Sequence, residues 1–254
     1  MSGSRTEIGR WLHCIKDGNQ ATVRLFCLPY SGAGASFFYP CAGELLPCIE
    51  LWPIQLPGRE TRLAEPPFGQ LPALIDALEP QLRPYLDRPF ALFGHSMGAL
   101  VAFELARALR DRHNLLPAHL FISGHGAPHL REDRTPIHAL PEAEFLAELR
   151  RLRGTPEAVL EHAELRDIIV PILRADFAVC ETYVYRSGKP LACPISALGG
   201  LADDMVTRDH LEAWQAHTSG PFSLHMFPGG HFYLQTSRPL LLQTILRRLS
   251  HVET

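Results

Sequence analysis

The sequence lacks several features that would assign it to particular classes of protein. Its 6 cysteines include no C-x-x-C pair, and several lie inside apolar runs, so we expect reduced, mostly buried thiols. The formal net charge is only −3 and no basic stripe is present, which argues against a nucleic-acid partner. No apolar run approaches the roughly 18 residues that span a membrane. The stretch MSGSRTEIGRWLHCIKDG has no signal-peptide core. These absences predict a cytoplasmic protein that binds neither nucleic acid nor membrane.

Loops that hold nucleotides or metals are missing too. The stretch CLPYSGAGASFF, residues 27–38, matches neither G-x-x-x-x-G-K-[ST] nor G-x-G-x-x-G, because Phe37 occupies the last position of the second pattern. His125 and His129 are four residues apart, but they lie on a Gly/Pro loop with no Glu between them. We interpret them as structural or pocket-lining residues and expect neither a metal nor a cofactor.

Apolar runs that alternate with helical patterns dominate what is present. A covered parallel sheet favours nearly continuous apolar strands, so this alternation predicts an α/β fold with a mostly parallel sheet and helices on both faces. With 254 residues, we expect one domain over residues 1–254 that ends in a helix at 239–250. The runs expected to form strands are 22–30, 49–56, 89–96, 118–125, 193–200 and 222–230.

One interval interrupts this alternation. No strand pattern occurs between about residues 131 and 186, and helical stretches fill 141–154 and 156–185. Pro171 should kink or break the second helix. A helical insertion of this length between two strands is typical of a lid, although ordinary crossover helices are the alternative.

The stretch PFALFGHSMGALVAFELARAL, residues 89–109, places a serine between Gly94 and Gly98, where an expected strand gives way to a helix. The serine could simply cap the helix. The pattern G-x-S-x-G in this setting is instead typical of a nucleophile elbow. Such a turn needs small residues at both glycine positions, because side chains there would collide with neighbouring backbone. We therefore expect Ser96 to be a nucleophile.

Two backbone amides are candidates for stabilising an oxyanion. The turn aims the amide of Met97, at the helix N-terminus, toward any developing negative charge. A second donor should come from the loop after an early strand, and the amide of Ser31 is the candidate there.

A serine hydroxyl is inert at neutral pH without a base, which is commonly histidine. Among 13 histidines, His231 in FPGGHFYL directly follows an expected strand on a double-glycine turn. His95 is adjacent to the serine, but its side chain should point away from the exposed face of the elbow. We therefore expect His231 to be the base.

The histidine in turn needs a carboxylate to orient it. GLADDMV offers Asp203 and Asp204 directly after an expected strand. Only one can serve, because adjacent residues on a loop point in different directions, and composition does not choose between them. Glu132 or Asp133, after the preceding strand, is an outside candidate. The resulting chain order of nucleophile, acid and base is that of an α/β-hydrolase.

With these motifs in place, the chain resembles the type II thioesterases that accompany nonribosomal peptide and polyketide synthetases, a family with the α/β-hydrolase fold and a helical lid. The resemblance covers nearly the whole chain, and its most specific parts are LPGRETR (56–62) and GGHFYL (229–234). At 30–32 the chain has YSG where the family often has HAG, and Asp204 replaces a family proline. The resemblance implies these roles: nucleophile Ser96, base His231, acid Asp203, and oxyanion amides Ser31 and Met97.

The resemblance also implies a function. Such enzymes hydrolyse misprimed or stalled acyl groups from the phosphopantetheine arm of carrier domains, need no cofactor of their own and act as monomers. It further suggests that Arg59 and Arg62 meet an acidic carrier domain, although ion pairs with Glu60, Glu65 or the lid are the simpler reading. The apolar lid residues would line an acyl chamber or equally serve as core: Leu146, Leu149, Ile168, Ile169, Phe177 and Val179.

Four other functions fit parts of the pattern. A medium-chain fatty acyl thioesterase shares the fold and machinery, and a general carboxylesterase would use the same residues. An acyltransferase of the malonyl class usually has Glu after the final glycine, where this chain has Ala99. A non-catalytic carrier-binding module would not need all three residues of a triad.

Overall fold

The computed structural model describes residues 4–16, 21–130 and 135–251. In this part of the chain eight strands form one sheet with the order β1-β2-β4-β3-β5-β6-β7-β8. From β4 to β8 all neighbouring strands are parallel, and β1 and β2 form an antiparallel hairpin at one edge. The strands are β1 Ser4–Ile8, β2 Leu12–Lys16, β3 Val23–Leu28, β4 Ile49–Pro53, β5 Phe90–His95, β6 His119–Ser123, β7 Ile195–Gly200 and β8 Phe222–Phe227.

The mostly parallel α/β sheet expected from the sequence is confirmed, and each of the six expected runs contains a strand. The hairpin of β1 and β2 was not expected. Its strands, SRTEI and LHCIK, are short and partly polar, as edge strands tend to be, so they lack the continuous apolar run that marks a buried parallel strand.

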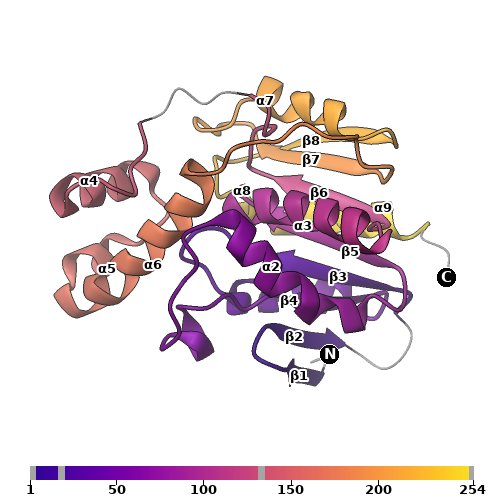
Figure 1. The fold of residues 1–254 in the computed structure, drawn as a ribbon, viewed down its shortest axis with the longest axis horizontal. Coiled ribbons are helices and arrows are strands. Elements are labelled where there is room, and N and C mark those ends of the chain that lie inside the picture. The colour runs from indigo at the N-terminus through magenta and orange to yellow at the C-terminus, as the bar shows by residue number, and fades with distance from the viewer. Residues whose placement is uncertain (1–3, 17–20, 131–134, 252–254) are drawn as a thin grey trace.

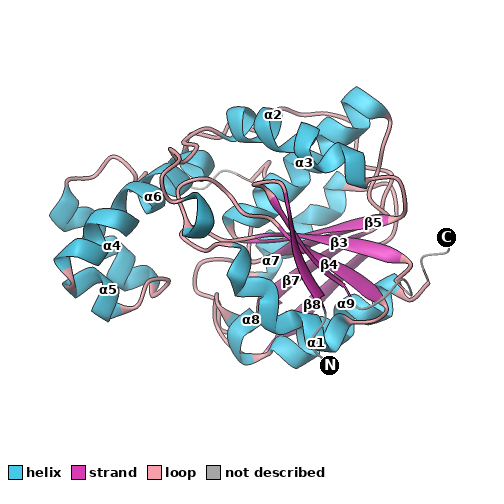
Figure 2. Cartoon of the chain, turned by 90° about the horizontal axis from the view of Figure 1, so that it is seen from below, coloured by secondary structure: helices cyan, strands magenta, loops and turns pink. Residues whose placement is uncertain are grey.

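Helices cover both faces of the sheet (Figures 1 and 2). One face packs against α2 (Leu71–Leu82) and α3 (Met97–His113), whose apolar residues join those of the strands in one core cluster. The other packs against α1 (Ala42–Leu45), α8 (Tyr233–Thr236) and α9 (Arg238–Leu249), which form a second cluster. The remaining short elements are η1 Ala35–Cys41, η2 Glu60–Arg62, η3 Arg83–Tyr85, α7 Arg208–Glu212 and η4 Ala213–His217.

Between β6 and β7 the chain forms three helices that project beyond one end of the sheet: α4 (Glu142–Leu152), α5 (Glu157–Glu161) and α6 (Ala163–Glu181) (Figure 1). They have a small apolar cluster of their own, which includes Phe145 and Leu160. None of the described helices is long and apolar enough to cross a membrane.

Of the kink or break expected at Pro171, the break is wrong. The helical stretch is interrupted at His162, whose ψ of 112° is extended, and α6 continues through Pro171. A proline inside a helix removes one hydrogen bond and costs about 3 kcal/mol. We attribute its tolerance here to the burial that follows directly, since Ile172 and Leu173 are both almost fully buried.

Candidate active site

Ser96 occupies a strained turn at the carboxyl end of β5. Its φ of 53° and ψ of −120° lie outside the helical and extended regions, a conformation that costs about 1–3 kcal/mol and persists where surrounding structure enforces it. The side chain of Ser96 makes no capping hydrogen bond to α3, so the capping interpretation is wrong. The hydroxyl is instead half-buried and faces a cavity.

The two glycines that flank the turn are sterically required. A Cβ atom on Gly94 would lie 2.0 Å from the carbonyl oxygen of Gly98, and one on Gly98 would lie 2.3 Å from the carbonyl oxygen of Leu28. Both contacts are with backbone, which cannot move aside as a flexible side chain can. The collision expected from the sequence is therefore confirmed at both positions.

His231 and Asp203 meet at the ends of β8 and β7. The Nδ1–H of His231 donates a hydrogen bond to Oδ2 of Asp203 over 2.9 Å. The other oxygen, Oδ1, accepts from the amides of Met205 at 2.9 Å and Val206 at 3.1 Å. Asp204, the alternative acid, is exposed and makes no such contact with His231 among the described residues.

The environment of Asp203 keeps it ionised. Its side chain has no exposed surface, and this burial acts to raise its pKa. The hydrogen bond and charge of His231, together with the amides of Met205 and Val206, act in the opposite direction and leave the pKa of Asp203 below its ordinary value. A buried carboxylate fixed on three donors can hold the His231 ring in one orientation and stabilise its protonated form.

Ser96 and His231 line one cavity, whose volume is about 50 Å³. Its other walls come from the loops after β3 and β8, including Tyr30 and Phe232, and from the helical insertion. The insertion contributes Leu149 and Leu152 from α4 and Leu173 and Phe177 from α6.

The six apolar residues singled out in the insertion lie in different surroundings. Leu149 and Phe177 line the cavity. Leu146 and Ile169 pack within the insertion, and Val179 packs in the main core. Ile168 is 46% exposed, so it belongs neither to a chamber nor to a core.

Of the two residues expected to supply oxyanion amides, Ser31 lines this cavity, and Met97 begins α3 directly after Ser96. Within the described part of the chain, neither amide donates a hydrogen bond to a protein acceptor. A backbone amide without an acceptor of its own is suited to receive a developing negative charge.

Asp176 holds the loop that carries Ser31, a role that sequence reasoning missed. Its Oδ2 accepts the amide of Gly32 at 2.7 Å, and its two oxygens receive a bidentate ion pair from Arg59 at 2.6 and 2.8 Å. The ion pair is buried, with side-chain exposures of 5% for Arg59 and 3% for Asp176. Asp176 belongs to α6, so the insertion is tied to the loop after β3.

The suggestion that Arg59 and Arg62 meet a carrier domain is wrong, because both are buried. Arg59 pairs with the insertion through Asp176, as the simpler reading expects. Arg62 pairs with Glu65 at 2.6 Å and lies over the ring of Trp11. The two arginines of the motif LPGRETR thus form ion pairs inside the protein rather than on its surface.

His95 is fully buried behind Ser96. Its Nδ1 is hydrogen-bonded to Oγ of Ser123 at 2.8 Å, and that hydroxyl is hydrogen-bonded to the Tyr233 hydroxyl at 2.6 Å. Burial holds the pKa of His95 well below its ordinary value, so the ring stays neutral. As expected, the side chain points into the protein rather than toward the exposed face of the turn.

The remaining candidates lie elsewhere. His129 is hydrogen-bonded to His217 at 2.7 Å, while Nδ1 of His125 contacts the carbonyl of Gly126. Among the residues that the structure describes, no group of three or more His, Cys, Asp or Glu side chains is placed to hold a metal ion. Glu132 and Asp133 lie outside the described residues.

A parallel sheet whose central strand ends in a serine elbow, with an Asp–His pair at the ends of two further strands, defines an α/β-hydrolase. Comparison with known proteins narrows this class. The family described as Thioesterase domain matches residues 23–251. The chain belongs to the thioesterase family.

Individual relatives agree with this placement. The gramicidin S biosynthesis protein GrsT of Aneurinibacillus migulanus is 43% identical over 244 residues, which cover 96% of this chain and 95% of that protein. Thioesterase PikA5 of Streptomyces venezuelae is 42% identical, with coverages of 89% and 80%. The structure of the type II thioesterase BorB from the borrelidin cluster superposes with a TM-score of 0.88 at 40% identity, covering 96% of this chain and 99% of that chain.

More distant relatives include the medium-chain S-acyl fatty acid synthase thioesterase of Rattus norvegicus, which is 32% identical over 88% of this chain and 86% of that protein. The similarity is therefore greater to the synthetase-cluster thioesterases, and the type II resemblance is confirmed.

Proposed function

We propose that the chain is a serine thioesterase that removes aberrant or stalled acyl groups from the phosphopantetheine arm of carrier domains in a nonribosomal peptide or polyketide synthetase. The hydrogen bond between His231 and the buried carboxylate of Asp203, on the cavity that also holds Ser96, carries this proposal. The relatives GrsT, PikA5 and BorB support the synthetase context.

In the proposed reaction Oγ of Ser96 attacks the thioester carbonyl while Nε2 of His231 accepts the hydroxyl proton. The amides of Ser31 and Met97 donate to the oxyanion of the tetrahedral intermediate. The C–S bond then breaks, and the pantetheine thiolate leaves and takes the proton held by His231, because an ordinary thiol has a pKa of about 8.5. The neutral His231 next deprotonates a water molecule, which attacks the acyl-serine. The acid is released as Ser96 Oγ regains a proton from His231.

The cavity supports a small acyl group as the preferred substrate. At about 50 Å³ it is far below the range of about 300–1,000 Å³ that drug-sized ligands occupy. The insertion, at about residues 131–186, acts in this proposal as a lid of a single domain over 1–254, because α4 and α6 form one wall of the cavity. Longer chains would require the lid helices to move outward.

The remaining parts of the proposal follow from the chemistry. The triad works without a cofactor, and the pantetheine arm belongs to the substrate. The partner is an acyl or peptidyl carrier domain, met as a monomer in the cytoplasm. The free thiols of Cys27, Cys41, Cys48 and Cys193 support a reducing compartment.

Hydrolysis of acetyl and longer acyl groups on a phosphopantetheinylated carrier protein, beside the matching acyl-CoA and p-nitrophenyl esters, tests the proposal. We expect the carrier-bound acetyl group to turn over best and Ser96→Ala to abolish turnover. A preference for medium-chain thioesters would point to a fatty acyl thioesterase. If oxoesters react best and the carrier brings no advantage, the chain is a general carboxylesterase.

A further inference from the structure

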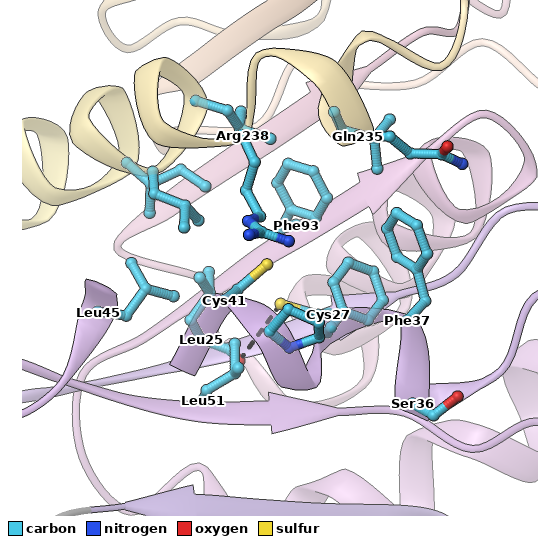
Figure 3. A pocket seen from close by; sticks show the side chains of 16 residues that line it. Leu25, Cys27, Ser36, Phe37, Cys41, Leu45, Leu51, Phe93, Gln235 and Arg238 are labelled. Carbon is cyan, nitrogen blue, oxygen red and sulfur yellow. Dashed lines mark hydrogen bonds between the residues drawn. The ribbon is translucent and has the colours of Figure 1, made fainter. Parts of the chain in front are cut away.

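A second cavity lies between the sheet and α9 (Figure 3). Its volume of about 290 Å³ is several times that of the cavity at Ser96 and close to the lower end of the range for ligand pockets, about 300 Å³. The walls are mostly apolar side chains of the strands β3, β4 and β5, of η1 and α1, and of α8 and α9, with the polar side chains of Ser36 and Gln235 among them. The proposed reaction uses none of them.

Arg238 is the only charged residue among those that line this cavity. Figure 3 shows its guanidinium directed away from α9 into the space between Phe93 and Cys41. Its Nε is buried and has no hydrogen-bond partner within the described part of the chain. Oε1 of Glu44 forms a long ion pair with this Nε at 3.7 Å, beyond hydrogen-bonding distance, and the two side chains are 40% and 41% exposed. An exposed pair of this kind contributes little to stability, so it leaves the Nε donor available to an anion in the cavity.

None of the residues that line the cavity is an anion, and Glu44, which pairs with Arg238, lies outside the lining. The two thiols beside it are Cys27 and Cys41. Burial raises the pKa of Cys27 well above its ordinary value and raises the pKa of Cys41 to about 11, so both thiols are neutral at physiological pH. Cys27 directs its S–H toward the carbonyl of Leu25. The site therefore offers one cation at the edge of a wholly uncharged, mostly apolar space.

The cavity adjoins the active site through an aromatic wall. Phe37 lines the second cavity, Tyr30 lines the first, and their rings meet edge to face with centroids 5.0 Å apart. The same segment, η1, begins four residues after Ser31. A ligand in the second cavity would thus contact the segment that continues the oxyanion loop.

We propose that this cavity is a binding site for a straight-chain aliphatic carboxylate, with the carboxylate on the guanidinium of Arg238 and the hydrocarbon chain between the sheet and α9. A single cation matches a singly charged head, and the apolar walls match an unbranched tail. Each methylene that enters the cavity should tighten binding about fourfold, until the space is filled. Binding here is independent of whether the protein hydrolyses thioesters.

Calorimetric titration of the Ser96→Ala protein with hexanoate, octanoate and 1-octanol tests this site without turnover. We expect octanoate to bind more tightly than hexanoate, and octanol more weakly than octanoate. Arg238→Gln should weaken octanoate binding about tenfold to a hundredfold, the effect of losing a hydrogen bond to a charged group, and leave octanol unchanged. Arg247→Gln, an exposed arginine on the same helix, is the matched control and should bind like the parent.

Methyl NMR of the same protein locates the ligand. Octanoate should shift the methyl resonances of Leu241 and Leu242, which line the second cavity, more than those of Leu149 and Leu173, which line the first. Three results would overturn the site: no binding of octanoate, equal binding to the parent and to Arg238→Gln, or shifts confined to Leu149 and Leu173. The last would show a product held at Ser96 instead. Loss of thioester turnover would affect none of these readouts.

Discussion

The ion pair between Arg59 and Asp176 allows a prediction that separates its effect on the position of the Ser31 loop from its effect on the stability of the protein. Asp176→Asn preserves the shape of the side chain but removes its charge, so the guanidinium of Arg59, 5% exposed, is left uncompensated. Breaking a buried pair in this way costs about 3–5 kcal/mol in the free energy of unfolding. Native domains have about 5–15 kcal/mol in total, so the variant should fold but with a clearly lower denaturant midpoint.

Activity should fall for a different reason. The amide of Gly32 donates to Oδ2 of Asp176 over 2.7 Å, and this contact fixes the backbone next to Ser31. Complete loss of one oxyanion donor lowers kcat by about 10²–10³-fold. A donor that is displaced but still present should lower kcat by less than this. We expect kcat of Asp176→Asn to fall about 10–100-fold, with a smaller change in KM, because the oxyanion forms only after the substrate binds.

A double variant makes the prediction sharper. Arg59→Met with Asp176→Leu removes both charges and should regain much of the lost stability, since buried pairs are often replaceable by apolar residues. It should not regain kcat, because the amide of Gly32 still lacks its acceptor. Glu65→Gln, which breaks the neighbouring pair with Arg62, is the control and should leave kcat near that of the parent. If kcat of Asp176→Asn stays within twofold of the parent while stability drops, the pair is structural only and the reasoning is refuted.

Three further predictions follow from single contacts. Gly98→Ala should abolish thioester turnover and destabilise the protein, because the new Cβ would lie 2.3 Å from the carbonyl oxygen of Leu28. A variant that still turns over thioesters would contradict the strained-turn geometry. Asp203→Asn should lower kcat about 10⁴-fold, as loss of the orienting carboxylate does in serine hydrolases. Asp204 is exposed, so Asp204→Asn should change kcat less than twofold. If instead Asp204→Asn shows the large loss and Asp203→Asn does not, Asp204 is the acid. His119, whose pKa burial lowers to about 4, stays neutral in the folded state, so the unfolded chain binds more protons and stability should fall as the pH drops from about 6.5 to 4. His119→Gln should reduce that pH slope of the unfolding free energy by about 1.4 kcal/mol per unit, and an unchanged slope in urea titrations at several pH values would show that His119 ionises normally.

The parts of the fold that were predictable are those with a local signal. Strands covered on both faces form nearly continuous apolar runs, so β3, β5 and β7 stand out in the sequence, and VRLFCL, interrupted only by Arg24, is one example. The strands of the β1–β2 hairpin are only five residues long and mix polar with apolar residues, so they lack that signal. Pro171 misled the expectation for α6 because helix propensity does not include the burial of the residues that follow.

The candidate site, like the fold, has a part with a local sequence signal and a part without one. The elbow is a local feature, and its two glycines mark it directly in the sequence. Asp203 was distinguishable from Asp204 only by the family resemblance, since orientation on a loop depends on backbone amides such as that of Val206. The ion pair between Arg59 and Asp176 joins positions 117 residues apart, so no periodic pattern in the sequence indicates it. An aspartate among the apolar residues of ILRADFAV was its one available sign.

The most direct test of the proposed function is to look for the acyl-enzyme itself. The protein would be mixed with an acetylated carrier protein, quenched in acid within milliseconds to seconds, digested and examined by mass spectrometry, with Ser96→Ala in parallel. We predict an acetyl group on the peptide that contains Ser96, formed before free acetate accumulates and missing from the variant. Turnover without any acetylated Ser96, or acetylation at another residue that persists in Ser96→Ala, would contradict the assignment of Ser96 as the nucleophile.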